Sequence, residues 1–388
     1  MKSILILNRV YPPSSGATGE MLCDLAKGLA AHGIDVTVLC MGEGNASDER
    51  VDGVRVVRIG GMFSKRSTLH RALAYVFMIP SLLVRALFLK KTDWVVTMTD
   101  PPMLAVLGPM ISFFKSNKVA HWAQDLYPEV AVELGVIPRG SVVGRLLRDI
   151  SSIALRHADA VVSIGRCMTV RLRARGVVYG KIHEISNWSP LVVPVPHRDN
   201  TFRANLGAEG AFVVAYSGNM GLAHEFDAVL EAAKKLQGRN VVFLMIGEGP
   251  RRAAVEAEAW RLGLKNMRFL PPQPREVLAE SLSAADAHIV TMRSNLCGLV
   301  VPSKFYGVLA AGRPCLFVGP EDSEVARVIL ETNVGRVLPS GDGSGLAEAI
   351  LEWIAHPEAH QIACRNAKQA GELATPQEGV REFMKMLE

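Results

Sequence analysis

The sequence predicts two doubly wound α/β domains, each a parallel sheet covered by helices. Apolar segments of strand length alternate with helix-like segments along the chain, which is the pattern of parallel sheets. At 388 residues, the chain is too long for one ordinary core. Residues 187–200 carry three prolines and no amphipathic period, which suits a linker. We therefore expect domains at residues 1–190 and 191–373, followed by a helix within residues 374–388.

The expected strands of the first domain are short, mostly apolar runs. They lie at residues 4–8, 36–39, 94–97, 118–123, 160–164 and 182–185. Amphipathic stretches between them predict helices at residues 19–31 and 68–89. The pattern restarts in the second domain, with strands at residues 212–216, 241–246, 267–270, 287–291 and 314–318. A last helix, near residues 376–387, either completes the second domain or crosses back to the first.

Composition places the chain among folded globular proteins, with 49% hydrophobic and 21% charged residues. The six cysteines are scattered without a CxxC pair, which predicts reduced, mostly buried thiols. Residues 3–7 read as a first strand rather than a signal peptide, so we expect a cytoplasmic protein. The most apolar segment, residues 72–89, is interrupted by Pro80 and Arg85, which predicts a buried or interfacial helix rather than a membrane span.

Positive charge is concentrated in the first half of the chain. Residues 1–190 hold 23 Lys and Arg against 15 Asp and Glu, a net charge of +8, whereas the remainder has 20 against 23. A basic half with apolar helices fits an anionic membrane surface or a phosphate-bearing acceptor, and a solvated basic face fits the same counts. Nucleic acid is disfavoured as a partner, because aromatic residues make up only 6% and no basic run interleaves with them.

Two turns between strand and helix in the second domain have the residues of a phosphate site. In residues 217–221, SGNMG, glycines after a strand let backbone amides approach an anion. In the second turn, Pro302 ends an extended segment, Ser303 is placed to cap the next helix, and Lys304 adds a cation. Two such turns in one domain predict a nucleotide-diphosphate ligand.

Several ordered motifs resemble those of GT-B glycosyltransferases. They are YPPSSGATGEMLCDLAKGLAAHGIDVTVL from residue 11, WAQDLYPEVAVELGV, YSGNMG, FLMIGEGP, FLPPQP and VPSKFYGVLAAGRP. Together they are similar to the retaining family-four enzymes, in the bacterial branch that builds O-antigen, colanic acid and related envelope polysaccharides. The resemblance covers nearly the whole chain and implies two Rossmann-like domains that face each other across a cleft.

The resemblance implies transfer of a hexosyl or N-acetylhexosaminyl group with retention at the anomeric carbon. The donor in this branch is usually a UDP-sugar, and the acceptor is commonly a polyprenyl-diphosphate-linked sugar. Such an acceptor implies a cytoplasmic enzyme that associates peripherally with the inner membrane face. It would account for the basic, apolar first half of the chain.

The resemblance also assigns a donor site. Gly218 and Asn219 lie in the loop that faces the donor phosphates in similar enzymes, and the further candidate donor contacts are His224, Gln273, Ser303 and Lys304. Many relatives have Arg at the position of Asn219 and Lys at that of His224, so the usual cationic pair is absent here. Lys304 is the best substitute for that charge, because without a metal the leaving UDP must be stabilised by cations and helix N-termini.

The sugar and ribose side of the expected donor site departs further from the family. Two glutamates usually stand eight positions apart there, and this chain has Leu299 and Gly307 instead. Ribose recognition and the identity of the donor therefore stay open. Gln273 lies in a loop where similar enzymes hold the base with backbone groups, and the role of an ordinary turn residue fits it equally well.

In the first domain, residues 15–19 follow the first strand and resemble a glycine-rich acceptor loop, with Gly16, Ala17 and Thr18 as candidate contacts. Asp125 is the candidate catalytic carboxylate, because it comes just after the carboxyl end of a predicted strand and can orient or deprotonate an acceptor hydroxyl. Glu129 follows one helical turn later as a possible assistant, although the helix dipole also favours an acid there.

Other chemistries are disfavoured by missing motifs. GxGxxG is absent, which argues against a dinucleotide and hydride transfer. No Asp-x-Asp pair or ligand cluster occurs, so we expect neither a metal nor a cofactor beyond the nucleotide-sugar substrate. Two alternatives remain open. One is a UDP-sugar epimerase on the same fold, and the other is a non-catalytic scaffold subunit.

Overall fold

The computed structural model describes residues 2–388 except 15, 43, 61–67, 190–192 and 209. The chain forms two compact units, each with a parallel-sheet α/β core, which confirms the predicted fold class. Unit 1 contains Met1–Asn187, Gly298–Val300 and Pro376–Glu388, and unit 2 contains Trp188–Cys297 and Val301–Thr375. The predicted domain boundary at residue 190 lies outside the described residues.

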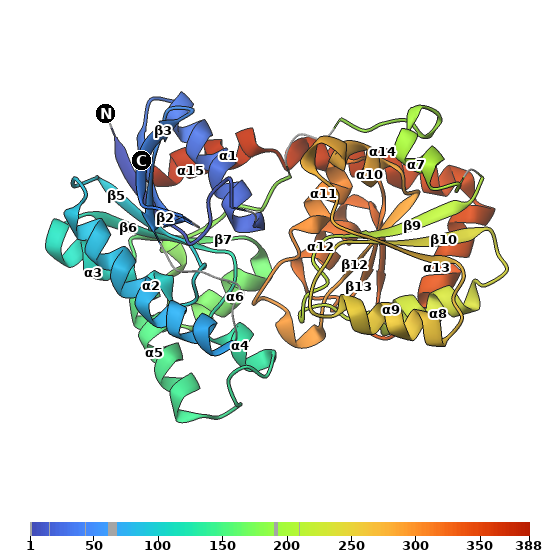
Figure 1. The fold of residues 1–388 in the computed structure, drawn as a ribbon, viewed down its shortest axis with the longest axis horizontal. Helices are drawn as coiled ribbons and strands as arrows, with labels where there is room; N and C mark the ends of the chain where they lie inside the picture. Colours follow the sequence, from blue (N-terminus) through green and yellow to red (C-terminus); the bar gives the residue numbers. More distant parts are fainter. Residues whose placement is uncertain (1, 15, 43, 61–67, 190–192, 209) are drawn as a thin grey trace. The chain divides into compact units, whose positions relative to one another are not determined.

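Unit 1 is built on an eight-stranded sheet with the order β3-β4-β2-β1-β5-β6-β7-β8 (Figure 1). Its strands are β1 Ser3–Leu7, β2 Asp35–Gly42, β3 Ser47–Val51, β4 Val54–Gly60, β5 Trp94–Thr97, β6 Lys118–Ala123, β7 Ala160–Ser163 and β8 Ile182–Glu184. Its helices are α1 Ala17–Ala31, α2 Thr68–Phe88, α3 Leu107–Lys115, α4 Glu129–Glu133, α5 Val142–His157, α6 Arg166–Ala174 and α15 Pro376–Leu387.

One edge of this sheet differs from the all-parallel prediction. β3 pairs with β4 in the antiparallel direction, whereas the other neighbouring strands of the sheet run parallel. Asp52 and Gly53, with φ of 51° and 82°, form the tight turn between them. An Asp-Gly pair favours a two-residue hairpin turn, so the sequence carried a signal for this hairpin that our prediction missed.

The C-terminal helix α15 packs in unit 1. The Phe383 ring lies edge-on to Trp122 of β6, with 4.8 Å between the ring centroids. Val380 packs against Gly28 of α1 so closely that a Cβ at position 28 would overlap its side chain. Of the two alternatives left open by the sequence, the structure has the last helix in the first domain.

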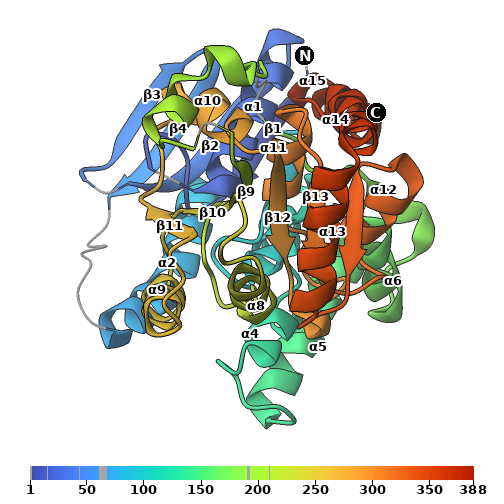
Figure 2. The same cartoon turned by 90° about the vertical axis from the view of Figure 1, so that its right-hand side faces the viewer.

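Unit 2 is built on a six-stranded parallel sheet with the order β11-β10-β9-β12-β13-β14 (Figure 2). Its strands are β9 Phe212–Ser217, β10 Val241–Ile246, β11 Met267–Leu270, β12 Ala287–Thr291, β13 Cys315–Val318 and β14 Gly335–Leu338. Its helices are α7 Thr201–Asn205, α8 Asp227–Lys235, α9 Arg252–Arg261, α10 Leu278–Ser283, α11 Lys304–Ala310, α12 Glu324–Thr332, α13 Gly343–Ala355 and α14 Pro357–Leu373.

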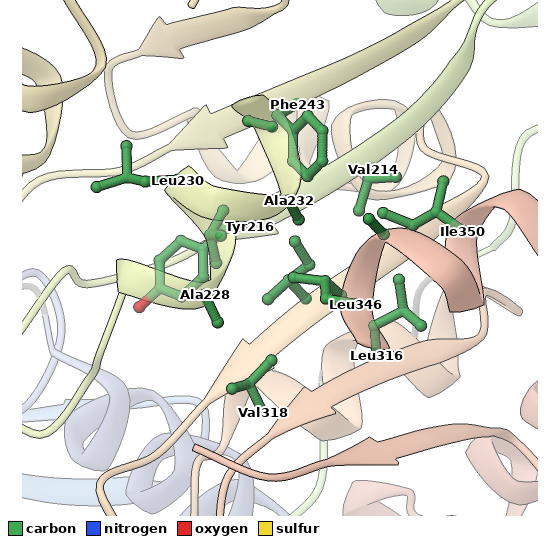
Figure 3. Close-up of a cluster of buried hydrophobic side chains, with 14 of the residues drawn as sticks. Val214, Tyr216, Ala228, Leu230, Ala232, Phe243, Leu316, Val318, Leu346 and Ile350 are labelled. Carbon is green, nitrogen blue, oxygen red and sulfur yellow. The ribbon is translucent and has the colours of Figure 1, made fainter. Parts of the chain in front are cut away.

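One large core of unit 2 lies between this sheet and helices α8, α9 and α13 (Figure 3). Val214 and Tyr216 of β9 contribute to it, because alternate residues of a strand point to the same face. Ile350 of α13 packs among them. The Tyr216 hydroxyl points away from Val214 and Ile350 in Figure 3, so a side chain anchored in the core carries its polar end out of the core.

The predicted linker is held at both ends. Asn187 is buried and exchanges two side-chain hydrogen bonds of 3.0 Å with Gln124, just beyond β6. In unit 2, the Val195 backbone N–H donates to Ser283 Oγ at 3.0 Å, and Asn200 Nδ2 donates to the Glu280 carbonyl at 2.8 Å. Residues 190–192 of the predicted linker lie outside the described part of the chain.

Candidate active site

The loop after β9 is folded by backbone contacts with the loop after β10. The Gly218 N–H donates to the Ile246 carbonyl at 2.9 Å, and the Met220 N–H donates to the Glu248 carbonyl at 2.7 Å. Gly218 has φ of 137°, a conformation that glycine adopts at no steric cost. Both loops follow carboxyl ends of neighbouring parallel strands, where ligands of such sheets bind.

Two glycines in the second of these loops allow this approach. Gly247 and Gly249 have φ of 139° and 143°. A Cβ on Gly247 would overlap the Gly218 carbonyl oxygen, and a Cβ on Gly249 would lie 2.5 Å from Asn219 Oδ1. Both glycines belong to the family motif FLMIGEGP, yet the prediction from sequence assigned them no role. Their spacing after an apolar strand was the available signal.

Lys304, the first residue of α11, extends its amine onto the loop after β9. Its Nζ donates to the Tyr216 hydroxyl and lies 3.3 Å from the Asn219 carbonyl oxygen and 3.2 Å from His224 Nε2. The same nitrogen is 4.0 Å from the centroid of the Tyr216 ring. The structure therefore brings together Gly218, Asn219, His224 and Lys304, all predicted donor residues, and adds Tyr216.

His224 is buried and has a defined tautomer. Its Nδ1 lies 2.6 Å from the Thr291 carbonyl oxygen, which can only accept a hydrogen bond, so Nδ1 carries the proton. Burial, and secondly the Lys304 charge, lower the pKa of His224 to about 3. Burial also lowers the pKa of Lys304 well below its usual value. The imidazole is therefore neutral and presents the lone pair of Nε2 to Lys304.

The other predicted donor residues take different roles. Ser303 precedes α11 with helical φ and ψ of −60° and −26°, and its side chain makes no capping hydrogen bond. The expected N-cap is therefore wrong, because a capping side chain needs a non-helical backbone. Gln273 lies in the loop after β11, where its Nε2 donates to the Pro271 carbonyl at 2.8 Å.

Neither position that holds a glutamate in the resembling family carries a polar side chain here. Leu299 is buried in unit 1, where its carbonyl accepts a 2.9 Å hydrogen bond from the Leu126 N–H. Gly307 lies within α11 of unit 2, and a Cβ there would lie 3.6 Å from Ser189 Oγ, an ordinary contact distance.

In unit 1, the predicted acceptor loop is mostly helix. α1 begins at Ala17, so Thr18 and Gly19 lie in its first turn and the loop ends at Gly16. A Cβ on Gly19 would lie 3.1 Å from the Val10 carbonyl oxygen, so the helix starts directly against the segment that follows β1. Residue 15 and the Ala17 side chain lie outside the described part of the chain.

Asp125 lies just beyond the carboxyl end of β6, as predicted. Its backbone forms an antiparallel bridge with Val300, which fixes the residue in unit 1. Burial, and secondly the charge of Asp100, raise the pKa of the Asp125 carboxyl to about 6. A carboxyl group poised this close to neutral pH is suited to take up and release protons.

Arg9 and Asp100 join Asp125 at this edge of the sheet, and the prediction from sequence missed both. Arg9 Nε forms an ion pair of 2.6 Å with Asp100 Oδ1. The three residues follow β1, β5 and β6, which are neighbours in the sheet. Their common position, two or three residues beyond a buried strand, was the signal in the sequence.

Glu129 and His121 are engaged in contacts within unit 1. Glu129, at the start of α4, lies 3.6 Å from the Arg175 guanidinium and 3.5 Å from that of Arg148. His121 Nδ1 is 3.0 Å from Thr97 Oγ1, and burial lowers the pKa of this histidine to about 3. Among the described residues, no three His, Cys, Asp or Glu side chains group as metal ligands.

Each half of the chain matches a family of glycosyltransferase domains. Residues 16–188 match the family described as "Glycosyl transferase 4-like domain". Residues 197–370 match the family described as "Glycosyl transferases group 1". The two matches fall on the two units in the order in which their main segments occur along the chain.

Two relatives extend over most of the chain. The "Probable glycosyltransferase WbjE" of Pseudomonas aeruginosa is 30% identical over 295 residues, which cover 74% of this chain and 73% of that protein. The "Putative colanic acid biosynthesis glycosyl transferase WcaI" of Escherichia coli K12 is 25% identical over 350 residues, which cover 84% and 85%.

Solved structures share the fold at lower identity. Sucrose-phosphate synthase of Thermosynechococcus elongatus has a TM-score of 0.81 at 16% identity, covering 100% of this chain and 98% of that one. HepE of Anabaena in complex with UDP-glucose has a TM-score of 0.74 at 15% identity, covering 100% and 98%. With its two domain matches and its relative WbjE, the chain belongs to the glycosyltransferases that combine a glycosyltransferase 4-like domain with a group 1 domain on a GT-B fold.

Proposed function

We propose that this glycosyltransferase moves a sugar from a UDP-sugar to a lipid-linked saccharide in the synthesis of an envelope polysaccharide. The observation that carries the donor assignment is the Lys304 amine, held over the loop of Gly218 and Asn219. Among the described residues, no carboxylate pairs with this amine, and burial disfavours its charged form, so we expect the negative charge of a bound diphosphate to stabilise the ammonium. The UDP-glucose complex of HepE and the name of WcaI support the donor class and the polysaccharide.

The proposed reaction divides between the two units. The bond from the anomeric carbon to the donor diphosphate breaks, and a bond to the acceptor oxygen forms with retention. Lys304 neutralises charge that grows on the leaving UDP, as a preorganised cation does most effectively away from water. Asp125 orients the acceptor hydroxyl and takes up its proton. None of these steps requires a metal, so we expect activity to persist in EDTA.

An apolar surface on unit 1 supports association with a membrane. It consists of the exposed parts of α2 and α3, which pack against each other, and we call it the α2–α3 surface (Figure 1). Its exposed members are Phe77, Val84, Phe88, Met110, Phe113 and Phe114. Phe88 and Phe113 are 80% and 83% exposed, which suits burial at the boundary between head groups and acyl chains.

Lysines lie at or just after the C-terminal ends of the two helices that form this surface. Lys115 Nζ donates to the Ala86 carbonyl at 3.0 Å, so the C-terminal ends of α2 and α3 are adjacent. Lys90, Lys91 and Lys118 are exposed nearby in the sequence. Basic side chains around an apolar patch favour anionic lipids. No helix in the described ranges has the length and hydropathy of a membrane span.

Replacement of Phe113 and Phe114 by Ser is expected to reduce binding to phosphatidylglycerol vesicles at least about tenfold, because two aromatic side chains no longer enter the interface. Vesicle flotation measures the bound fraction. Trp260→Ser, which removes an aromatic residue that is 87% exposed on α9, is the matched control and should leave flotation unchanged. Equal flotation of the double variant and the wild type would contradict docking through the α2–α3 surface.

A thermal-shift screen with UDP, GDP, ADP and TDP tests the donor assignment, because a ligand that binds only the native state raises Tm. We expect a selective rise with UDP, and product analysis with UDP-sugars then separates transfer from epimerisation. A selective rise with another nucleotide would overturn the UDP assignment. If no nucleotide raises Tm and none binds in calorimetry, the catalytic proposal fails in favour of a scaffold.

A further inference from the structure

The Lys304 amine has three hydrogen-bond partners, and each of them presents an acceptor to it. The Tyr216 hydroxyl donates its own proton to the Asn219 carbonyl at 2.7 Å, so its oxygen accepts from Lys304. His224 Nε2 accepts as well, because Nδ1 carries the ring proton. The three hydrogens of an ammonium group therefore meet three acceptors, on Tyr216, Asn219 and His224.

A phosphate oxygen that binds this ammonium must replace one of these acceptors. The Asn219 carbonyl oxygen, 3.3 Å from Nζ, keeps the hydrogen bond from the Tyr216 hydroxyl when Lys304 leaves. By contrast, His224 Nε2 is buried with its ring, and within the described part of the chain its one hydrogen bond comes from Lys304. Release of His224 would leave a buried acceptor without a hydrogen bond, which is unfavourable.

We propose that His224 and Tyr216 are positioning residues, which hold the Lys304 ammonium where it binds the donor diphosphate. When the donor binds, Lys304 exchanges only its contact with the Asn219 carbonyl for a contact with a phosphate oxygen. The inference rests on the proposed function, because it concerns how the same donor site holds its cation. The inference goes beyond that function, because it assigns a role to His224 and Tyr216, which are uncharged and so do not bind the diphosphate through charge.

The ammonium at this place can be supplied from either of two positions in the chain, 224 or 304. His224 Nε2 and Lys304 Nζ are 3.2 Å apart, so side chains from the loop after β9 and from α11 end at the same place. A lysine at position 224 can therefore supply an ammonium to that place when position 304 is apolar. The ammonium then belongs to the loop after β9 instead of α11, and it lies over the same residues, Gly218 and Asn219.

The decisive experiment compares the wild type with Lys304→Met and with the double variant His224→Lys/Lys304→Met. Calorimetry with UDP, and NMR titration with uridine, measure binding with and without the diphosphate. We expect Lys304→Met to lower UDP affinity about 10- to 100-fold and to leave uridine affinity unchanged, because a charge-assisted hydrogen bond is lost. The double variant is expected to regain at least about tenfold of the UDP affinity.

Tyr216→Phe supplies a second test that keeps the ring and removes only the hydroxyl. We expect it to lower UDP affinity about three- to tenfold without a change for uridine, because Lys304 loses a positioning partner. A folded double variant that binds UDP no better than Lys304→Met overturns the inference. If the double variant does not fold, unchanged UDP affinity of Tyr216→Phe overturns it.

The control for the proposed function is built into the same titrations. If the wild type binds neither UDP nor uridine, the donor assignment itself fails. If the wild type binds both and the variants lose both equally, the donor assignment stands and the positioning role fails. Asp227→Asn, at the start of α8 and outside these contacts, should bind UDP and uridine as the wild type does.

Discussion

Asp125→Asn is expected to reduce turnover about 10²- to 10⁴-fold while UDP affinity stays unchanged. The amide keeps the shape of the carboxyl and cannot take up the proton of an acceptor hydroxyl. Asp125 belongs to unit 1, whereas the predicted UDP contacts belong to unit 2. Steady-state rates with a lipid-linked acceptor, together with UDP calorimetry, measure the two effects separately.

The pH dependence gives this prediction a second readout. The carboxyl of Asp125 has a pKa of about 6 in the folded chain, so the wild-type rate should fall as pH drops below 6. In Asp125→Asn the residual rate should lack this acid limb. A variant profile that keeps the limb near pH 6 would assign the titration to another group.

As pH rises, the free energy of unfolding should fall while the rate of turnover rises. The folded pKa lies above the ordinary value of 3.8, so between pH 4 and pH 6 the unfolded chain releases a proton that the folded chain retains. The free energy of unfolding therefore falls across this window and stays low above it. Asp125→Asn removes an ionisation cost of the order of 1 to 3 kcal/mol, so its Tm should exceed the wild-type value at pH 8 and match it near pH 4.

Asp149→Asn, an exposed position on α5, is the matched control for the charge change. It should alter neither turnover nor the pH profile. If Asp125→Asn lowers Tm at pH 8 along with turnover, the loss reflects damaged folding and the catalytic role is not supported.

Gly247→Ala is expected to abolish UDP binding and to lower the free energy of unfolding by more than about 2 kcal/mol. A Cβ at this position overlaps the Gly218 carbonyl oxygen, and φ of 139° is strained for alanine. The loops after β9 and β10 must separate, which moves the backbone beneath Lys304. Chemical denaturation and UDP calorimetry measure the two losses.

Gly263→Ala is the control for Gly247→Ala, because it introduces the strain of a positive φ without an overlap between the new Cβ and another atom. Gly263 has φ of 67°, and a Cβ there meets no atom within 4 Å. Its substitution should cost about 1 kcal/mol and leave UDP binding intact. A similar small cost and intact UDP binding for Gly247→Ala would show that the two loops tolerate separation.

The sequence predicted strands well where both faces are buried. β5, β6, β10 and β12 are almost wholly buried and have the bounds that their apolar runs predict. β11 also has its predicted bounds, although only Met267 of its four residues is buried. β3 was missed because all five of its side chains, SDERV, are exposed, so hydrophobicity does not mark it. Its position is set by pairing with β4 and by the Asp52-Gly53 turn, which only turn chemistry reveals.

The sequence pointed to parts of the candidate site where one short segment carries a recognisable motif. Lys304 and the loop of Gly218 and Asn219 were identified, and the structure places them together. Tyr216 was missed because it reads as an ordinary apolar strand residue, and only its hydroxyl leaves the core. The positions of Arg9 and Asp100 just beyond predicted strands were a signal that our prediction did not use, whereas their ion pair joins residues 91 positions apart and is encoded by no local pattern.

The return of α15 to unit 1 determines when the first domain can be completed during synthesis. The ribosome makes Trp122 and Gly28 early, yet Phe383 and Val380, which pack against them, emerge only after the whole of unit 2. Until then the apolar side chains of unit 1 that α15 covers stay exposed, while residues 188–375 already provide all of unit 2. The domain whose translation begins first is therefore completed after unit 2, and a stop codon directly before Pro376 damages the N-terminal half of the protein.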